Sequence, residues 1–175
     1  ASEGGDGPGV PAGTVEVCLF FPTSAGADAA TDAAKFYTSL IPGSAITSEL
    51  RPAPDAPAIN VSFTLGGARF RALNGGRAAL TEAASITVTT KDQAETDALW
   101  DALTADGGSP GRCGWLTDRW GVSWQIVPEA LLRTVAGPDA EGARRAMAAM
   151  HPMSKIIVAD LERAYSGEST TATTS

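Results

Sequence analysis

The apolar and polar positions in the first half of the chain follow a strand period, then a helix period, then strand periods again. From 28 to 40, apolar side chains recur at the i, i+3, i+4, i+7 spacing of an amphipathic helix. Val61, Phe63 and Leu65 alternate with polar neighbours, as in a half-buried strand. The pattern predicts a strand at 14–21, a helix at 28–40, strands at 44–50, 60–65 and 68–73, and a turn at 74–76.

The same order of elements starts again near residue 85. It predicts a strand at 85–90, a helix at 93–105, a loop at 107–111 and strands at 114–116 and 122–127. The stretch GARFRAL at 67–73 aligns with GVSWQIV at 121–127, glycine with glycine and aromatic with aromatic. An internal repeat of two βαβββ modules explains this alignment. We therefore expect an α+β fold in which two curled sheets face a shared small-molecule cleft.

These elements set the expected domain boundaries. One domain covers 14–128, with module one at 14–76 and module two at 82–128. Helices expected near 139–150 and 158–165 form a C-terminal helical region at 129–165, which we expect to pack on the domain or on a second subunit. The small and polar residues at 1–13 and 166–175 predict disordered tails, because they have little apolar surface to bury.

Composition and charge narrow the possible partners. Hydrophobic residues make up 43% of the 175 residues, enough for a core, and the formal net charge is −7. This charge disfavours nucleic acid as a partner, and no apolar run is long enough to span a membrane. The first residues do not resemble a signal peptide, so we expect a cytoplasmic protein. Cys18 and Cys113 lack a CxxC spacing and are expected to be separate reduced thiols.

Several stretches resemble a known family. They are FYTSLIPGSAI at 36–46, LNGG at 73–76, CGWLTDRWGVSWQIVP at 113–128, and the pieces at 146–156 and 161–165. The chain resembles the PhnB-like group, also labelled 3-demethylubiquinone methyltransferase-like, of the glyoxalase/bleomycin-resistance/dioxygenase (vicinal oxygen chelate, VOC) superfamily. The resemblance covers roughly 14–165 and implies a VOC fold, a small-molecule ligand and a homodimer. No Gly-rich loop of the kind that binds a cofactor in a doubly wound sheet follows a predicted strand, which disfavours methyl transfer.

Enzymes of this superfamily resemble one another in holding a divalent ion with His, Glu or Gln at four equivalent strand positions. By motif matching, these positions are Val17, Arg71, Ala83 and Gln125. Two alkyl groups, one permanent cation and one amide do not supply a metal shell. We therefore expect no metal and no cofactor.

Strand alternation and the family pattern together predict the residues that face a ligand. Leu19 and Phe21 of the first strand, Arg69 and Arg71 of the fourth, and Ser123 and Gln125 of the last are expected to face the cavity. The arginines would favour an anionic or carbonyl-bearing ligand. In the alternative interpretation, both arginines form solvated ion pairs with Glu16 or Glu82.

Trp115 and Trp120 are candidates for stacking on a flat ligand, although aromatic residues at this density more often build a core. Three other reactive side chains have structural interpretations that we favour. His151 is expected at a junction between helices, Cys113 in packing, and Asp118 in a turn between two strands.

Two functions remain open from the sequence. One is a binding protein that holds an anionic or aromatic metabolite without turning it over. The other is a metal-independent enzyme of the isomerase or lyase type, in which Arg71 stabilises an oxyanion and Gln125 or Ser123 orients the substrate. They differ in whether a titratable group reaches the ligand.

Overall fold

The computed structural model describes residue 11 and residues 13–168. The chain divides into two compact units, the first ending at Ala79 and the second beginning at Leu80. Most of the two predicted tails lies outside the described residues. The described part of the second tail differs from the prediction, because the last helix continues to Ser166 and Gly167 ends it with a φ of +79°.

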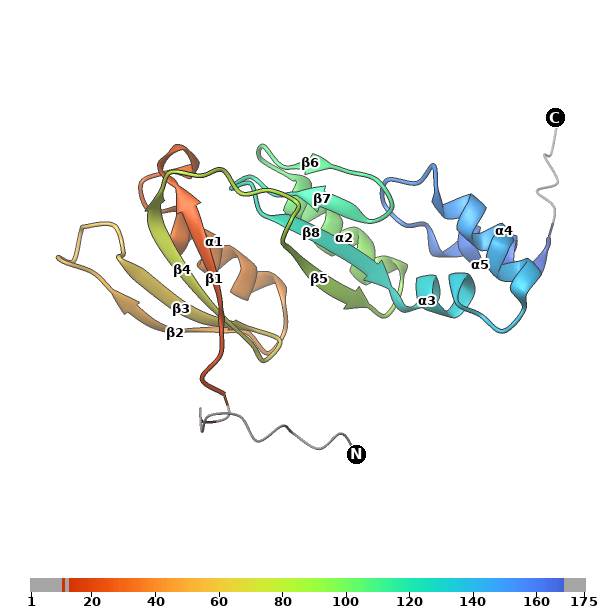
Figure 1. Ribbon diagram of the computed structural model, residues 1–175, viewed down its shortest axis with the longest axis horizontal. Helices are drawn as coiled ribbons and strands as arrows, with labels where there is room; N and C mark the ends of the chain where they lie inside the picture. Colours follow the sequence, from red (N-terminus) through yellow and green to blue (C-terminus); the bar gives the residue numbers. More distant parts are fainter. Residues whose placement is uncertain (1–10, 12, 169–175) are drawn as a thin grey trace. The chain divides into compact units, whose positions relative to one another are not determined.

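The first unit contains one mixed four-stranded sheet and one long helix (Figure 1). Its elements are β1 (Val17–Pro22), a 3₁₀ turn (Thr23–Ala25), α1 (Ala29–Leu40), β2 (Ala45–Leu50), β3 (Asn60–Leu65) and β4 (Ala68–Gly76). The strand order is β1-β4-β3-β2, in which β1 runs parallel to β4 and the other neighbours are antiparallel. The sheet is open, with β1 and β2 at its edges.

Helix α1 covers one face of this sheet and buries the core of the first unit (Figure 1). Tyr37 of the helix and Phe63 of β3 are almost fully buried, with ring centroids 6.4 Å apart. The Phe63 ring stacks on Phe70 of β4 at 5.5 Å. These contacts fill the space between helix and sheet, so the opposite face of the sheet is the face left open.

The turn predicted at 74–76 is instead the end of β4. Asn74 pairs with Phe21 of β1, and its side-chain amide donates to a carboxyl oxygen of Asp28 and to the carbonyl of Ala58, both at 2.9 Å. Its side-chain oxygen accepts from the Ala30 N–H at the start of α1. These contacts keep turn-forming residues within the strand, a case in which tertiary structure overrides local propensity.

Asp28 joins the strands to the helix through a dense set of hydrogen bonds. It accepts from Thr31, the Ala58 N–H and Asn74, and pairs with Arg51 at 2.8 Å. Burial of this carboxyl raises its pKa, but the hydrogen bonds from Ala58, Arg51, Thr31 and Asn74 outweigh burial and hold the pKa below the usual 3.8. The ionised form of Asp28 therefore stabilises the first unit.

The second unit repeats the arrangement and adds three helices. Its elements are β5 (Ser85–Thr90), α2 (Gln93–Thr104), β6 (Ser109–Pro110), β7 (Trp115–Thr117), β8 (Ser123–Pro128), α3 (Glu129–Val135), α4 (Ala140–Met150) and α5 (Val158–Ser166). The strand order is β5-β8-β7-β6, with β5 parallel to β8. The sequence pattern missed α3, and the two-residue strand β6 lies within the predicted loop.

The two units pair their strands in the same way, as the internal repeat predicts. Phe70 pairs with Val17 in the first sheet, and the aligned Trp124 pairs with Ile86 in the second. Phe70 and Trp124 are both buried, on the helix-covered face. The two modules therefore share the parallel pairing of their first and last strands and the choice of buried face.

The C-terminal helices pack on the second unit around Leu131, Ile156 and Leu161. Gln93 of α2 ties them to the module, donating to the Ile156 carbonyl at 3.1 Å and accepting from the Val158 N–H at 2.7 Å. Among the described residues, no helix has the length and apolar character needed to cross a membrane.

We expect Asp28→Asn to lower the free energy of unfolding of the first unit by about 2–3 kcal/mol at pH 7, because it removes a charged acceptor from a part-buried network. The matched change Asp32→Asn, on an exposed residue of the same helix, should cost less than about 0.5 kcal/mol. Urea unfolding followed through the NMR amide signals of β3 measures both.

The effect of Asp28→Asn depends on pH in a direction fixed by the lowered pKa. The wild-type advantage is complete well above 3.8 and shrinks as the pH falls through that value toward the lower folded pKa. An equal loss in the Asp28 and Asp32 variants, or a wild-type advantage that grows in acid, would contradict this role.

Candidate functional site

The open face of the first sheet carries a row of polar side chains across its strands. The register aligns Cys18, Arg71, Ser62 and Ser48 in one row and Arg69 with Thr64 in the next. A cavity of about 560 Å³ lies on this face. Its polar lining residues are Thr14, Glu16, Thr47, Ser48, Ser62, Thr64, Arg69 and Arg71. Hydroxyl and guanidinium groups therefore dominate the cavity's chemistry.

Glu16 pairs with both arginines of this cavity. The Arg71 Nη2 lies 2.7 Å from one Glu16 carboxyl oxygen, and the Arg69 Nη2 lies 4.0 Å from the other. The arginine side chains are about half exposed, whereas Glu16 is 19% exposed. This is the ion pairing that the sequence left open, with Glu16 as the partner. Two cations facing one carboxylate leave a net positive charge at the cavity.

Cys18 lies beside Arg71 in the same row. Burial raises the pKa of its thiol; Arg71 lowers the pKa and Glu16 raises it, with a net upward shift. The thiol is therefore protonated at neutral pH, which disfavours a nucleophilic role for Cys18.

Leu19 and Phe21 do not share a face with Arg71, contrary to the expectation from sequence. Leu19 pairs with Ala72 and Phe21 pairs with Asn74, so both point to the face that α1 covers. Both are buried, Phe21 almost completely. The physical reason is the parallel register. It pairs Cys18 with Arg71, so the even-numbered residues of β1 lie on the same face as Arg71.

The same register corrects two of the four positions matched to the superfamily's metal ligands. Val17 pairs with Phe70 on the helix-covered face, and Ala83 lies before β5 begins at Ser85. The open-face partner of Arg71 is Cys18, and the open-face partner of Gln125 is Thr87.

These positions do not fit the divalent ion that the resemblance implies. One thiol, a guanidinium, a hydroxyl and an amide supply at most one anionic donor, where such an ion needs several anionic, imidazole or oxygen donors. Within the part of the chain that the structure describes, no group of three or more His, Cys, Asp or Glu side chains could hold a metal ion.

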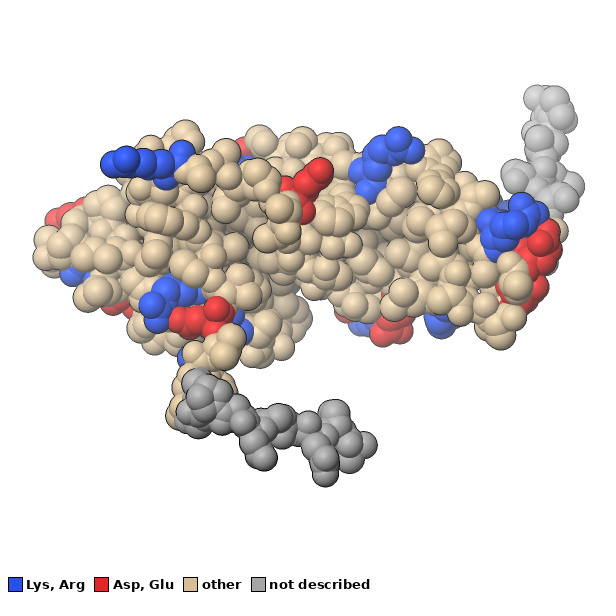
Figure 2. Space-filling model, in the orientation of Figure 1, with Lys and Arg blue, Asp and Glu red and all other residues tan. Residues whose placement is uncertain are grey.

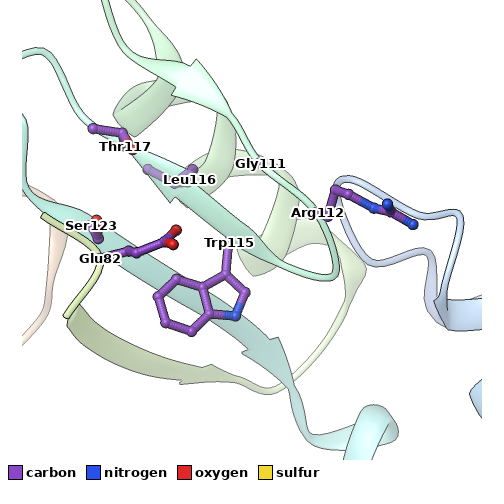
Figure 3. A pocket seen from close by; sticks show the side chains of 7 residues that line it. All are labelled: Glu82, Gly111, Arg112, Trp115, Leu116, Thr117 and Ser123. Carbon is purple, nitrogen blue, oxygen red and sulfur yellow. The ribbon is translucent and has the colours of Figure 1, made fainter. Parts of the chain in front are cut away.

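The open face of the second sheet carries Gln125, Trp115 and Ser123. Trp115 pairs with Gln125, and Thr117 pairs with Ser123. The Gln125 amide donates to the Ser85 hydroxyl at 2.9 Å. A cavity of about 530 Å³ is lined here by Glu82, Gly111, Arg112, Trp115, Leu116, Thr117 and Ser123 (Figure 3). Trp115 thus lines this cavity, and its stacking on a flat ligand stays a prediction.

Trp120 does not line this cavity. The Arg119 guanidinium lies over the Trp120 ring, 5.1 Å from its centroid. The backbone N–H of Trp120 donates to the Asp118 carboxylate. Asp118 is buried and also accepts from the Val122 N–H and the Trp124 indole at 3.0 Å each. The prediction that Asp118 is a turn residue is confirmed, because it holds the turn between β7 and β8.

The rim of the second cavity is attached to the connection between α4 and α5. The N–H groups of Cys113 and Gly114 donate to the carbonyls of Met153 and Ser154, both at 2.8 Å. The Ser154 hydroxyl in turn donates to the Gly111 carbonyl. The Cys113 sulfur lies 3.7 Å from the carbonyl of His151, which follows α4. Cys113 and His151 therefore occupy structural positions, as expected.

The hydroxyl groups around Arg71 were not predicted from the sequence. Ser62 and Thr64 stood out only as the polar partners in the alternation of β3, while Thr47 and Ser48 belong to a strand whose register has a bulge. Only the pairing of β2, β3 and β4 brings them to one cavity.

We expect Gly114→Ala to destabilise the second unit by about 2–4 kcal/mol. A Cβ at Gly114 would lie 2.7 Å from the Ile126 carbonyl oxygen, and the residue has a φ of +84°. Gly121→Ala is the matched control, because its φ is +90° but the nearest atom is 3.9 Å away, so it should cost about 1 kcal/mol. Urea unfolding followed by tryptophan fluorescence reports on this unit, which contains Trp100, Trp115, Trp120 and Trp124. Equal costs for the two variants would contradict the close approach at Gly114.

The comparisons with known proteins agree with this architecture. The solved structure of the PhnB protein from Bacillus cereus is 28% identical, with a TM-score of 0.57, and the alignment covers 66% of this chain and 98% of that one. Protein PA1353 from Pseudomonas aeruginosa is 20% identical, with a TM-score of 0.54 and coverages of 66% and 96%, and it supports the fold alone. No curated protein matches the sequence.

A family model described as 3-demethylubiquinone-9 3-methyltransferase matches residues 14–127. The match ends before α3, so the C-terminal helices lie beyond it. Because it spans well over half of the sequence, the chain belongs to this family, the PhnB-like group of the glyoxalase/bleomycin-resistance/dioxygenase (VOC) superfamily.

Proposed function

We propose that this protein binds a small organic anion against Arg69 and Arg71, on the open face of its first sheet. The observation that carries the proposal is the pairing of two half-exposed guanidinium groups with a single carboxylate, Glu16, inside one cavity. A guanidinium has five N–H donors, so the contacts with Glu16 leave several available for a carboxylate or carbonyl oxygen.

The rest of the cavity suits such a ligand. Ser48, Ser62 and Thr64 place neutral hydroxyl groups in the rows beside the arginines. Neutral donors can bind an oxyanion without adding a charge of their own, and Glu16 holds the Arg71 side chain in one orientation. The volume of about 560 Å³ lies within the range of small-molecule sites.

Glu16 also supports a second candidate function, a metal-independent isomerase or lyase. It is a titratable group that lines the same cavity as Arg71, which is the feature that separates an enzyme from a binding protein. In this version Arg71 stabilises a developing oxyanion while Glu16 accepts a proton from the substrate. Loss of turnover with retained binding in Glu16→Gln would favour the enzyme.

Methyl transfer is not part of the proposal, although the family description includes it. Each sheet is mixed rather than doubly wound. The connection from β1 to α1 contains a single glycine, Gly26, rather than a Gly-rich phosphate-binding loop. The resemblance supports a cytoplasmic homodimer as a further part of the proposal.

Benzoate and its neutral analogue benzamide test the anion site. We expect benzoate to shift the Arg69 and Arg71 Nε–H signals in NMR spectra of the full chain, and benzamide to leave them in place. Arg71→Gln, which installs the residue found at the equivalent position 125, should weaken benzoate binding about tenfold or more. Arg77→Gln, at an exposed arginine outside the cavity, is the matched control. Equal binding of benzoate and benzamide would contradict the proposal.

A further inference from the structure

We propose that the cavity of the second unit binds an organic ammonium ion, held between the indole ring of Trp115 and the carboxylate of Glu82. The site lies wholly within the second unit, so the inference does not depend on the proposed anion site. A quaternary ammonium group, such as that of choline, has the chemistry that this pair of side chains recognises.

Trp115 presents its ring at the open face of the second sheet. It lies in β7, pairs with Gln125 of β8, and is partly exposed although its strand neighbour Leu116 is buried. Figure 3 shows the ring lying over the sheet at the cavity, with the Glu82 side chain on the same side of the strands. An accessible indole face attracts cations because of its electron-rich π system.

The charges that line the cavity favour a cation. Glu82 is exposed, and no described Lys or Arg side chain lies within 4.0 Å of its carboxylate. Arg112, which also lines the cavity, points away from Trp115 (Figure 3) and donates to the His151 carbonyl at 3.0 Å. Thr117 and Ser123 contribute neutral hydroxyl groups. The negative net charge of the chain, −7, adds a favourable long-range field.

The donor set suits a large organic cation better than a metal ion. A single carboxylate cannot replace the hydration shell of a divalent ion, which needs several oxygen or nitrogen donors. A quaternary ammonium ion is weakly hydrated and gains from contact with an aromatic face. The cavity volume of about 530 Å³ accommodates such a group.

Hydrogen bonds to the connection between the C-terminal helices order the backbone of the segment that leads into Trp115. The backbone N–H groups of Cys113 and Gly114 donate to carbonyls of the α4–α5 connection. The backbone N–H of Trp115 donates to the Arg112 carbonyl at 3.0 Å. The backbone at Trp115 is thus ordered before a ligand binds, which lowers the entropy cost of binding there.

The experiment compares choline with 3,3-dimethyl-1-butanol, an uncharged molecule of nearly the same shape. Each is titrated into the full-length chain, and the indole N–H signal of Trp115, assigned by its loss in Trp115→Phe, is followed by NMR. We expect a saturable shift with choline and none with the alcohol. Trp115→Leu should weaken choline binding about tenfold or more, and Glu82→Gln about threefold or more. Because Trp115→Leu has no indole signal at this position, its binding is measured from the backbone amide signals of β7 and β8.

Two controls keep the outcomes separate. Arg71→Gln should leave choline binding unchanged, so that failure of the anion site and failure of the ammonium site are distinguishable. If Trp115→Leu fails to fold, Glu82→Gln and the comparison of the two ligands on the wild type still decide the matter. Equal binding of choline and the alcohol would overturn the proposal, as would choline binding that is unchanged in a folded Trp115→Leu or Glu82→Gln variant.

Discussion

The parallel pairing of the first and last strands in each module determines which side chains are available for function. In the first sheet β1 pairs with β4, and in the second β5 pairs with β8, both in parallel. Because paired residues share a face, this register places Phe70 and Trp124 under the helices. Every alternate residue of β4 and β8 then faces away from the helix, including Arg71 and Gln125.

The two open faces have diverged in chemistry while the buried faces have stayed alike. Arg71 corresponds to Gln125 and Arg69 to Ser123 in the repeat, so the first face carries positive charge and the second is neutral along the same strand. Glu82, in the segment before β5, adds a negative charge to the cavity of the second face, and Arg112 lies at the same cavity but donates to the His151 carbonyl. Figure 2 shows only small, separate groups of basic and acidic side chains on the visible face, which agrees with local recognition of small ions rather than a broad charged interface.

The sequence predicted the repeat, the main helices and the longer strands, because each has a strong period and the aligned stretches match residue by residue. It did not predict which face of β1 is buried. Val17, Leu19 and Phe21 are apolar, but Phe20 on the other face is apolar too, so alternation alone could not decide. The pairing with β4 decides it. Asn74 lies in a strand because it pairs with Phe21 of β1 and because Asp28 and Ala58, distant in sequence, accept hydrogen bonds from its side chain.

Under both proposals, this member of the superfamily recognises ions through guanidinium, indole and carboxylate groups rather than through a bound metal. The most direct test is elemental mass spectrometry of the untagged protein after incubation with manganese, iron, nickel and zinc followed by desalting. We expect less than about a tenth of an equivalent of each metal, because the open-face positions lack a suitable donor set. One equivalent of any of these metals, retained in the wild type, would contradict it.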